Sequence, residues 1–600
     1  MKNFFFVLLA FCFCTSVTAQ SKRSQTLKLN HLINDLEIRQ NEEHSFEIKL
    51  EQNTYYTINV IQEGIDLVVS VIDSEGKVKA EVDSPNGMFG PEKILFSPET
   101  AGQYRISVKP LDEKTNSPVG KYDIEIQKVS KTLKKIPVKD LLTDFNLLQN
   151  AYYETRIGLW YNTKVQFDSI CNLQKNKITA PMNALEFYRI LAPVVAFTKE
   201  GHSNIKISDE TIAYLRQNGT YIPIGIKVLD KKVYVINDLP GFKLKGLLLS
   251  KINGEGIESI MQKMLDIEPA DGFNITSKYR WVEESFSKYY ARYFPESKTF
   301  KLELTNPKNG EKIVYDNVPA YNSKDFTKLN AEIVKSIPNY TYEKASDFSI
   351  DLKTSTAVIT VNTFSLGSYD DKRQGFQTFL EKAFDTISDK KIKNLIIDIR
   401  KNEGGEQGME DQFLSFLINQ EYKKYKYVEI PGFTYSFLEY TNYVNQKENL
   451  IKELQEDFYR TNDGRYLNME GHYAGQNPNA KNFKGNVYIL ISGLTFSGGS
   501  EFAALAKNNT KATFIGEETG GGYYGNSSGS FLSFTLPNSK INGRIPLCKF
   551  VIEPKKDITI PFGRGVLPDF EVQPSIEDYF SGVDTEMEFV KTMISKKNKS

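Results

Sequence analysis

The chain has 600 residues, which is too long for one domain and predicts three to five. Its 75 basic residues balance its 75 acidic residues, so we expect neither a nucleic-acid partner nor a charged tail. The four histidines are too few to suggest a histidine metal site, and we expect no metal and no other cofactor. Cys171 and Cys548 fit no metal spacing and are expected to be buried thiols, with one disulfide as the alternative.

The N-terminus has the pattern of an export signal. A lysine at position 2 precedes the apolar run Phe4–Cys14, which is too short to span a bilayer comfortably. Small residues at Val17–Ala19 then precede Gln20, as a signal peptidase requires. We therefore expect residues 1–19 to be a cleaved signal peptide. The mature protein is then periplasmic or extracellular and has no transmembrane segment.

Residues 20–130 are predicted to form a β-sandwich. Apolar and polar residues alternate in Ser45–Leu50, Tyr56–Val60 and Tyr104–Val108, and Asp73–Gly76 is a turn signal between such runs. Short strands at regular spacing are typical of a sandwich of about 100 residues. The order of these strings resembles the prepeptidase C-terminal-like domain of bacteria, a small sandwich found beside secreted peptidases. That resemblance implies no catalytic residue in this part.

Residues 131–218 change to a helical pattern. Apolar residues recur at helical spacing in Lys139–Tyr153 and again in Met182–Ala196. The second helix is followed by a glycine and a short strand, in a string that contains Glu200-Gly201-His202-Ser203. A lone histidine is more often an ordinary surface or core residue than a catalytic one, so the local sequence leaves the role of His202 open.

Residues 219–320 are predicted to form a PDZ-like module. Tyr221–Ile226 and Lys232–Ile236 have strand composition, and Gly246–Gly254 reads as a strand ending in an Asn-Gly turn before a helix that starts at Ile257. This order resembles the middle of a PDZ domain. The resemblance implies binding of an extended peptide at a sheet edge. The carboxylate-binding loop of a typical PDZ domain is not recognisable here.

Residues 347–600 alternate strands and helices. Ser355–Val361 and Lys393–Arg400 are expected strands, with a helix over Gln374–Ile387 between them. This alternation predicts an α/β domain with a largely parallel sheet, whose functional loops follow the carboxyl ends of the strands. Residues 421–482 interrupt it with an aromatic and polar insertion that lacks a clear period, and we expect this insertion to be a functional cap.

A serine stands at the turn between a buried strand and a helix in this last domain. Val487–Ile491 is the apolar strand, Thr495–Gly499 is the turn that carries Ser497, and Glu501–Lys507 has helix-forming composition. Free backbone N–H groups and the positive end of the helix dipole make such a turn suitable for a nucleophile. The alternative is a helix N-cap serine in a glycine-rich turn.

Four strings in this domain together resemble a known family. They are NLIIDIRKNEGG, TFSGGSEFA, IGEETGG and GRGVLPDFEV, in this order along the chain. They are similar to the tail-specific or C-terminal-processing serine peptidases of family S41, including the tricorn-like branch. The resemblance covers about residues 135–600. It implies a multidomain α+β protein with a ClpP/crotonase-like α/β catalytic domain, acting as a serine endopeptidase on polypeptides.

The resemblance also implies site residues. Ser497 matches the nucleophile, its own N–H or that of Gly498 would be one oxyanion donor, and the loop with Gly405 would supply another. The processing branch uses a lysine about 25 residues after the serine, but the chain has a glycine- and tyrosine-rich string there. The tricorn-like branch uses a histidine from the helical segment, and His202 stands in its place.

The orienting partner of His202 is less well defined by the resemblance. The family has a glutamate shortly before a GV.PD string, where this chain has Phe562. Glu517 is therefore expected as the third catalytic residue, with Glu518 and Ser203 as alternatives. The missing lysine and glutamate also leave open a catalytically inactive peptide-binding or scaffold protein. Carbohydrate binding is a further alternative that rests on aromatic composition alone.

Overall fold

The computed structural model describes residues 21–84, 87–112, 116–155, 160–337, 344–469, 471, 474–475, 477–553, 555 and 559–597. The predicted signal peptide, residues 1–19, lies outside these residues. The chain divides into two compact units, Met1–Thr132 and Leu133–Ser600, and each is described by itself. No helix among the described residues has the length and apolar character needed to cross a membrane.

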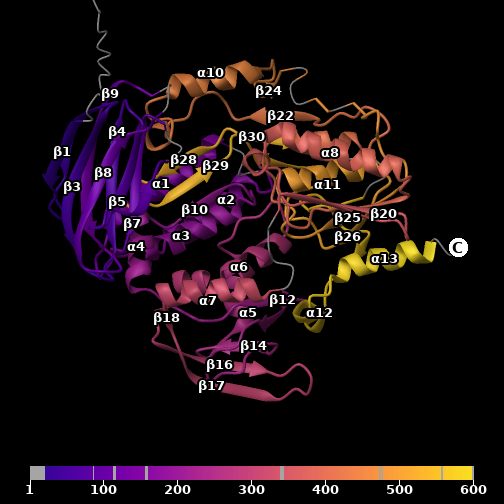
Figure 1. Cartoon of the computed structure of the whole chain (residues 1–600), viewed down its shortest axis with the longest axis horizontal. Helices are drawn as coiled ribbons and strands as arrows, with labels where there is room; N and C mark the ends of the chain where they lie inside the picture. The colour runs from indigo at the N-terminus through magenta and orange to yellow at the C-terminus, as the bar shows by residue number, and fades with distance from the viewer. Residues whose placement is uncertain are drawn as a thin grey trace, which may run out of the picture. The chain divides into compact units, whose positions relative to one another are not determined.

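The N-terminal unit consists of two sheets around one hydrophobic core (Figure 1). One sheet has the strand order β1-β3-β8-β5-β6 and the other β2-β9-β4-β7. The predicted alternation is confirmed in β3, where Phe46, Ile48 and Leu50 are buried in that core. The strands are β1 (Ser21–Thr26), β2 (Ile33–Arg39), β3 (Glu42–Leu50), β4 (Tyr56–Glu63), β5 (Leu67–Ile72), β6 (Val78–Val82), β7 (Phe89–Phe96), β8 (Gly102–Pro110) and β9 (Val119–Lys128).

The second unit begins with the predicted helical segment. Its elements are α1 (Val138–Thr155), α2 (Lys164–Lys175), α3 (Ala184–Phe197), β10 (Asn204–Lys206), α4 (Asp209–Asn218) and β11 (Thr220–Tyr221). The two helices expected from periodicity are confirmed as α1 and α3. Thr163 and Asn183 begin α2 and α3 with capping boxes, which satisfy the free N–H groups of each first turn. Cys171 on α2 and Cys548 are free buried thiols, as expected.

The region predicted to be PDZ-like contains a sheet with the order β12-β13-β14-β16-β17, and β15 pairs with β14. Asn253 and Gly254 have positive φ angles in the expected Asn-Gly turn, and the next helix begins at Ile257 as predicted. The elements are β12 (Ile226–Leu229), β13 (Lys232–Val235), β14 (Leu248–Ile252), β15 (Glu255–Gly256), α5 (Ile257–Leu265), α6 (Thr276–Tyr293), β16 (Thr299–Thr305), β17 (Lys312–Pro319), β18 (Tyr321–Asn322) and α7 (Ser323–Ser336).

Strand β12 is one of the two edges of this sheet, with β17 the other, at which an added peptide strand could pair. Its backbone at Val228 is already occupied, because Val228 N–H donates to the Glu283 carboxylate and Arg280 Nη2 donates to Val228 O at 3.0 Å. Both side chains come from α6. A peptide could pair with β12 only by displacing them. Peptide binding by this region therefore stays a prediction.

A six-stranded sheet of order β19-β20-β21-β25-β26-β31 forms the α/β part. All pairings except β19 with β20 are parallel, which agrees with the predicted largely parallel sheet. Its elements are β19 (Ser346–Asp351), β20 (Thr356–Val361), η2 (Leu366–Ser368), α8 (Lys372–Asp389), β21 (Asn394–Asp398), α9 (Met409–Ser415), β25 (Asn486–Ile491), α11 (Gly498–Asn509), β26 (Thr513–Gly516), β31 (Phe570–Glu571), α12 (Ile576–Ser581) and α13 (Thr585–Lys597).

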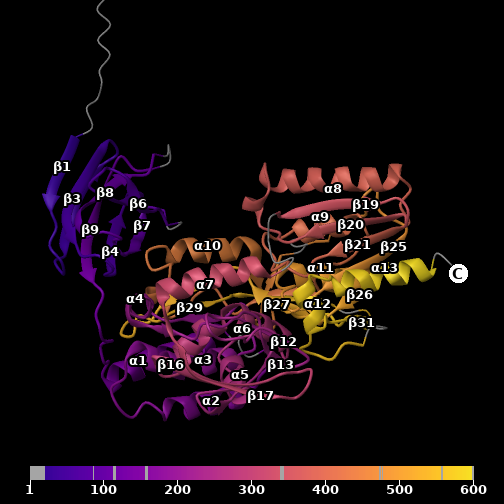
Figure 2. The ribbon, with the colours of Figure 1, turned by 60° about the horizontal axis from the view of Figure 1, so that its bottom comes forward.

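The central strands of this sheet are buried on both faces. Ile489 and Ile491 of β25 belong to the large core that includes α8, α9 and α11, whereas Leu490 packs in a separate cluster with Val590 and Ile594 of α13. The same alternation explains why β21 and β25 are continuous apolar runs rather than alternating ones. Figure 1 shows α8 and α13 on opposite sides of the strands, and Figure 2 shows α8 next to β19.

The insertion at 421–482 contains more regular structure than expected. Helix α10 (Lys447–Asp457) was not predicted, although Leu450 and Leu454 are buried one turn apart. The insertion also contains β22 (Tyr427–Ile430), η3 (Leu438–Tyr440), β23 (Phe458–Arg460) and β24 (Tyr466–Asn468). Four further strands follow later in the chain, β27 (Gly525–Ser528), β28 (Leu532–Thr535), β29 (Asn542–Ile545) and β30 (Cys548–Val551). They complete the sheets β23-β24-β22-β30-β27 and β10-β29-β28.

Candidate active site

Ser497 lies between β25 and α11 in an unusual backbone conformation. Its φ and ψ angles are 50° and −125°, which a residue with a side chain rarely adopts. The turn is held from both sides, because Phe496 N–H donates to Asn402 O at 3.0 Å and Gly520 N–H donates to Thr495 O at 2.8 Å. These contacts stabilise a strained turn that leaves Ser497 partly exposed at the start of a helix.

His202 and Ser497 are brought together from positions 295 residues apart. His202 Nε2 and Ser497 Oγ are 3.0 Å from each other, which is hydrogen-bond distance. The imidazole stacks on Phe496, with 4.7 Å between ring centroids and 30° between the rings. Phe496 in turn contacts Trp281 edge-on at 5.3 Å. The geometry is that of a hydroxyl nucleophile with an adjacent base.

Burial keeps the His202 imidazole neutral. Burial and, to a smaller extent, the positive charge of Arg544 together lower the pKa of His202 to about 3, although the backbone of Ser527 acts in the opposite direction. An effect in this direction is that of a hydrogen-bond acceptor, which in the Ser527 backbone is the carbonyl. The neutral ring can accept a proton from Ser497 at any pH well above 3.

Two backbone N–H groups lie beside Ser497. Gly498 is the first residue of α11, so its N–H has no acceptor within the helix. A Cβ added to Gly498 would lie 3.7 Å from Gly405 N, and one added to Gly404 would lie 2.6 Å from Gly498 N. Gly404 and Gly405 have φ angles of 96° and 150°, and any side chain at Gly405 would overlap Phe364. The predicted donors Gly405 and Gly498 are therefore neighbours.

Asn402 links these two donor segments and was not singled out by the sequence. It is fully buried, and its Oδ1 accepts from Gly404 N–H at 2.8 Å while its Nδ2 donates to Val361 O at 3.1 Å. Its backbone carbonyl accepts from Phe496 N–H in the nucleophile turn. The side chain of Asn402 thus holds the glycine loop, and its backbone carbonyl holds the serine turn. An asparagine directly after a buried strand was the available signal.

The structure places the predicted third residue elsewhere. Glu517 Oε1 lies 3.3 Å from Arg280 Nε and accepts from Gly493 N–H at 3.1 Å. Glu518 pairs with Arg564 and accepts from Gly565 N–H at 2.7 Å. Each carboxylate has a structural partner of its own. Neither carboxylate has a described contact with His202.

Several buried polar side chains lie close to His202 instead. Glu200 and Ser203 flank the histidine and are about 1% exposed. Burial raises the pKa of Glu200 well above its usual range, and the Ser527 hydroxyl opposes this shift. Burial likewise raises the pKa of Tyr152, and the Ser203 hydroxyl opposes it. The sequence drew attention to Ser203 but not to Glu200, Ser527 or Tyr152.

Asp271 joins the His202 loop to the glycine-rich loop after β26. It is 1% exposed, and its two carboxylate oxygens accept from Gly201 N–H at 2.8 Å and from Gly522 N–H at 3.2 Å. Neighbouring residues extend the same link, because Gly272 N–H donates to Lys199 O at 2.9 Å and Asn274 Nδ2 donates to Thr519 O at 2.5 Å. This segment fixes His202 relative to the serine turn.

Asp271→Asn is expected to lower kcat/KM by about 10- to 100-fold. The amide N–H₂ of the asparagine would face the N–H of either Gly201 or Gly522, and the repulsion between these two donors would displace the loop that carries that glycine. Burial raises the pKa of Asp271 to about 6. The carboxylate therefore gains a proton as the pH falls through 6, and wild-type activity should fall with it. The variant should lack this acid limb. Initial rates from pH 4.5 to 8 test this, with the exposed Asp266→Asn as the matched control.

A buried ionic cluster lies behind the other side of the serine helix. Lys424 Nζ is 2.6 Å from Glu410 Oε1 and Asp411 Oδ2 and 3.1 Å from Glu501 Oε1. Burial acts to lower the pKa of Lys424, but these carboxylates, Glu501 first, raise it well above its usual value. Glu501 is in the first turn of α11, and Glu410 accepts from Gly408 N–H at 2.9 Å. The lysine therefore connects the serine helix to the segment after the glycine loop.

Lys424→Met is expected to destabilise the second unit by about 3–5 kcal/mol, because it leaves three buried carboxyl groups without their cation. Urea unfolding followed by circular dichroism measures this change. Lys423→Met, at an exposed neighbouring position, is the control and should unfold as wild type does. An equal midpoint for both variants would contradict the assigned role of Lys424.

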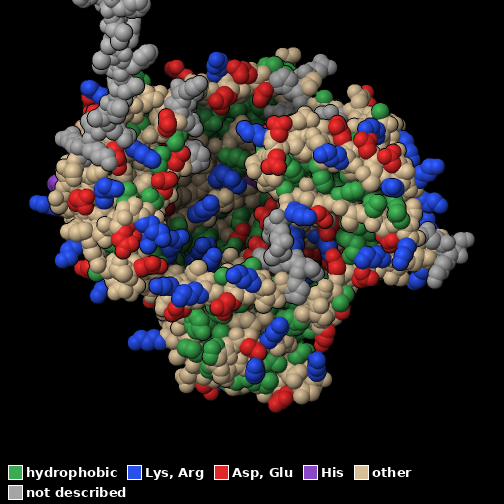
Figure 3. All heavy atoms as spheres, in the orientation of Figure 1, with side chains coloured by type: hydrophobic (Ala, Val, Ile, Leu, Met, Phe, Trp, Pro, Cys, Tyr) green, Lys and Arg blue, Asp and Glu red, His purple; other side chains and the backbone are tan. Residues whose placement is uncertain are grey.

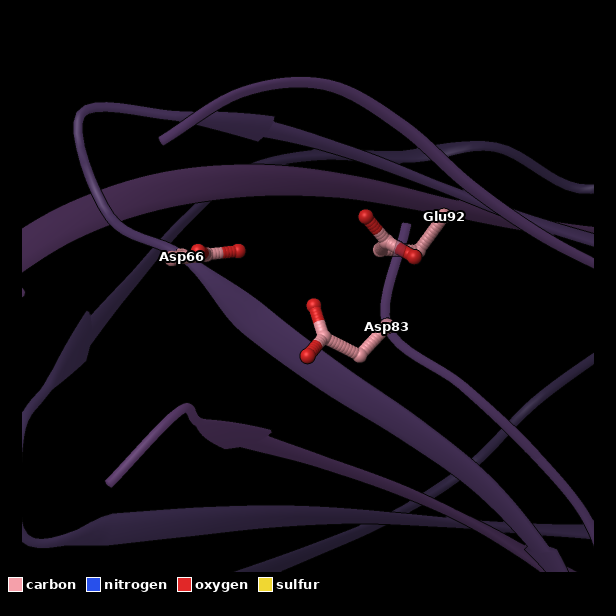
Figure 4. A group of neighbouring side chains, drawn as sticks. All are labelled: Asp66, Asp83 and Glu92. Atoms are coloured by element: carbon pink, nitrogen blue, oxygen red, sulfur yellow. The ribbon is translucent and has the colours of Figure 1, made fainter. Parts of the chain in front are cut away.

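We assign no metal or nucleic-acid site. Among the described residues, Asp66, Asp83 and Glu92 form one acidic group whose ligand atoms lie within 4.8 Å of one another (Figure 4). It lies in the N-terminal unit, where Gln62 and Ser84 already donate hydrogen bonds to Asp66 and Glu92. Basic and acidic side chains are intermingled on the face seen in Figure 3, which agrees with the balanced composition.

Comparison with known proteins finds one family match. Residues 355–572 match the model of Peptidase family S41, a range that includes Ser497 and the glycine loop but not His202. A comparison with curated proteins finds no relative of the chain.

Solved structures with the same fold include two of CPAF. A CPAF mutant has a TM-score of 0.52 and 12% identity, and covers 76% of this chain and 96% of its own. CPAF complexed with lactacystin has a TM-score of 0.51 and 13% identity, and the match covers 76% of this chain and 98% of the CPAF chain. The match to the photosystem II D1 C-terminal processing protease covers 74% of this chain and 97% of that protease, at 13% identity and with a TM-score of 0.34. Because these sequence identities are low, the similarity to CPAF shows a shared fold only.

Proposed function

Since residues 355–572 make the chain a peptidase of family S41, we propose that it is an exported serine endopeptidase in which Ser497 attacks peptide bonds and His202 is the general base. The hydrogen bond of 3.0 Å between His202 Nε2 and Ser497 Oγ carries this proposal. The polypeptide substrate, the serine mechanism and the export signal at 1–19 are parts of the same proposal.

Acylation begins with attack of Ser497 Oγ on the substrate carbonyl carbon. His202 Nε2 takes the hydroxyl proton, and the N–H groups of Gly405 and Gly498 stabilise the oxygen that becomes negative. The C–N bond then breaks, and His202 returns the proton to the leaving amine. The serine is left as an ester with the N-terminal part of the substrate. Water attacks this ester with His202 again as base, and Ser497 is regenerated.

We propose that the Ser527 carbonyl orients His202 during these steps. The Ser527 backbone favours the protonated form of the imidazole, so its carbonyl can accept a hydrogen bond from Nδ1–H once the ring is charged. Nδ1 has no hydrogen bond of normal geometry within the described part of the chain. Such catalytic contacts commonly tighten only when substrate is bound.

Cleavage of a reduced and alkylated polypeptide by the purified full chain tests the proposal. We expect internal cuts with new N-termini, insensitive to chelators and absent in Ser497→Ala. If the folded wild-type protein binds such polypeptides without cutting them, the chain is instead a catalytically inactive peptide-binding protein.

A further inference from the structure

Arg544 lies beside the catalytic histidine on a strand that contributes nothing else to the mechanism. Strands β29 and β10 pair antiparallel, with Arg544 opposite Asn204, two residues after His202. Arg544 Nε donates to His202 O at 3.4 Å. Its guanidinium carbon lies 4.3 Å above the ring of Phe531, whose centroid is 6.2 Å from that of the His202 imidazole. The side chain is therefore held at the edge of the reacting groups.

The charge of Arg544 has no carboxylate partner within the described part of the chain. Three other arginines of this unit do have one: Arg280 pairs with Glu283, Arg400 with Asp398 and Asp584, and Arg564 with Glu518. Arg544 instead makes one backbone contact and one aromatic contact. Burial lowers its pKa, which shows that its charge is partly removed from water. A half-buried cation without a counter-ion is unfavourable unless a ligand supplies one.

The two terminal nitrogens of Arg544 remain available to a ligand. A guanidinium presents its donors in a planar fork that matches a carboxylate, and its stacking on Phe531 fixes the plane of the fork. The positive charge also acts on His202, since it lowers the pKa of the imidazole. A carboxylate bound to Arg544 would therefore lie within a residue or two of the peptide bond at Ser497.

We propose that Arg544 is a specificity-determining residue that binds a substrate carboxylate close to the bond that is cut. This inference rests on the proposed peptidase function. The carboxylate is either an aspartate or glutamate side chain or the α-carboxylate at the end of a polypeptide. The active site thereby selects polypeptides that carry a negative charge next to the cleavage position.

Matched peptide pairs test the proposal with the full chain. One pair differs by Glu against Gln on either side of the cut, and a second by a free against an amidated C-terminus. Wild type should favour the charged member in one of the pairs by about 10- to 100-fold in kcat/KM, as a charge-assisted contact provides. Which pair shows the preference identifies the source of the carboxylate.

Arg544→Gln should reduce that preference to about one, and Arg544→Glu should reverse it in favour of lysine-containing peptides. Arg216→Gln, an exposed arginine on α4, is the control and should keep the wild-type preference. Arg544→Gln should also move the protonation of His202 to higher pH, because a nearby positive charge is lost. Circular dichroism checks the fold of each variant.

The possible outcomes distinguish failure of the proposed role of Arg544 from failure of the proposed peptidase function. A wild-type enzyme that cuts charged and neutral peptides equally, or an Arg544→Gln variant that keeps the preference, would overturn the role of Arg544 alone. No cleavage of any peptide and no reaction of Ser497 with a serine-directed probe would overturn the peptidase function itself.

Discussion

Replacing Ser497 by alanine is expected to reduce kcat for peptide hydrolysis by about 10⁴- to 10⁶-fold, which is the loss seen when a serine nucleophile is removed. The attacking oxygen disappears, whereas the donors of Gly405 and Gly498 and the position of His202 stay. Binding of substrate should therefore change little. Steady-state rates on a quenched peptide, with the protein concentration raised to detect residual activity, measure the effect.

Ser497→Ala should fold normally, because Ser497 is partly exposed and its hydroxyl contacts only His202 among the described residues. The alanine also keeps the strained φ of 50°, so a small change in unfolding midpoint is expected. Ser595→Ala, at an exposed serine of α13, is the matched control and should keep full activity. Equal activity of Ser497→Ala and Ser595→Ala would remove Ser497 from the mechanism.

Replacing His202 by glutamine is expected to reduce kcat by a similar factor, about 10⁴- to 10⁶-fold, because nucleophile and base act as one unit. Glutamine roughly preserves the size of the side chain and a hydrogen bond to Ser497, but it cannot hold a proton. The double variant with Ser497→Ala should therefore be about as inactive as either single variant. The rates of the three variants on one peptide test this coupling.

The pH dependence distinguishes His202 from Asp271. The pKa of His202 is lowered to about 3 by burial, so its protonation lies below the acid limb expected from Asp271 near pH 6. His202→Gln should lose activity evenly between pH 5 and 8. His31→Gln, at an exposed histidine of the N-terminal unit, is the control. Residual activity of His202→Gln above a few per cent would point to another base.

Strong local patterns made much of the fold predictable. The apolar runs that became β21 and β25 are short and bounded by turn residues, and the serine turn carries the glycines that a close approach requires. Periodicity likewise predicted α1, α3 and α8 to within a few residues. Helix α10 was missed because the aromatic residues around it obscured a short amphipathic pattern.

The supporting side chains of the site could not be found from the sequence. Asp271, Asn402 and Lys424 act through backbone groups or ionic partners that are distant along the chain, and no local spacing reveals such contacts. Glu517 was predicted as a substitute for the orienting glutamate of the family, because this chain has Phe562 in that place. In the structure Glu517 pairs with Arg280 and accepts from Gly493 N–H instead.

Labelling with a fluorophosphonate probe tests the central claim, that Ser497 is a nucleophile activated by His202. The full chain is incubated with the probe, digested, and the modified residue is located by mass spectrometry. We expect a single adduct on Ser497, no adduct in Ser497→Ala and labelling slowed by about 10³-fold or more in His202→Gln. Equal labelling of wild type and Ser497→Ala, or an adduct on a different residue, would contradict the account.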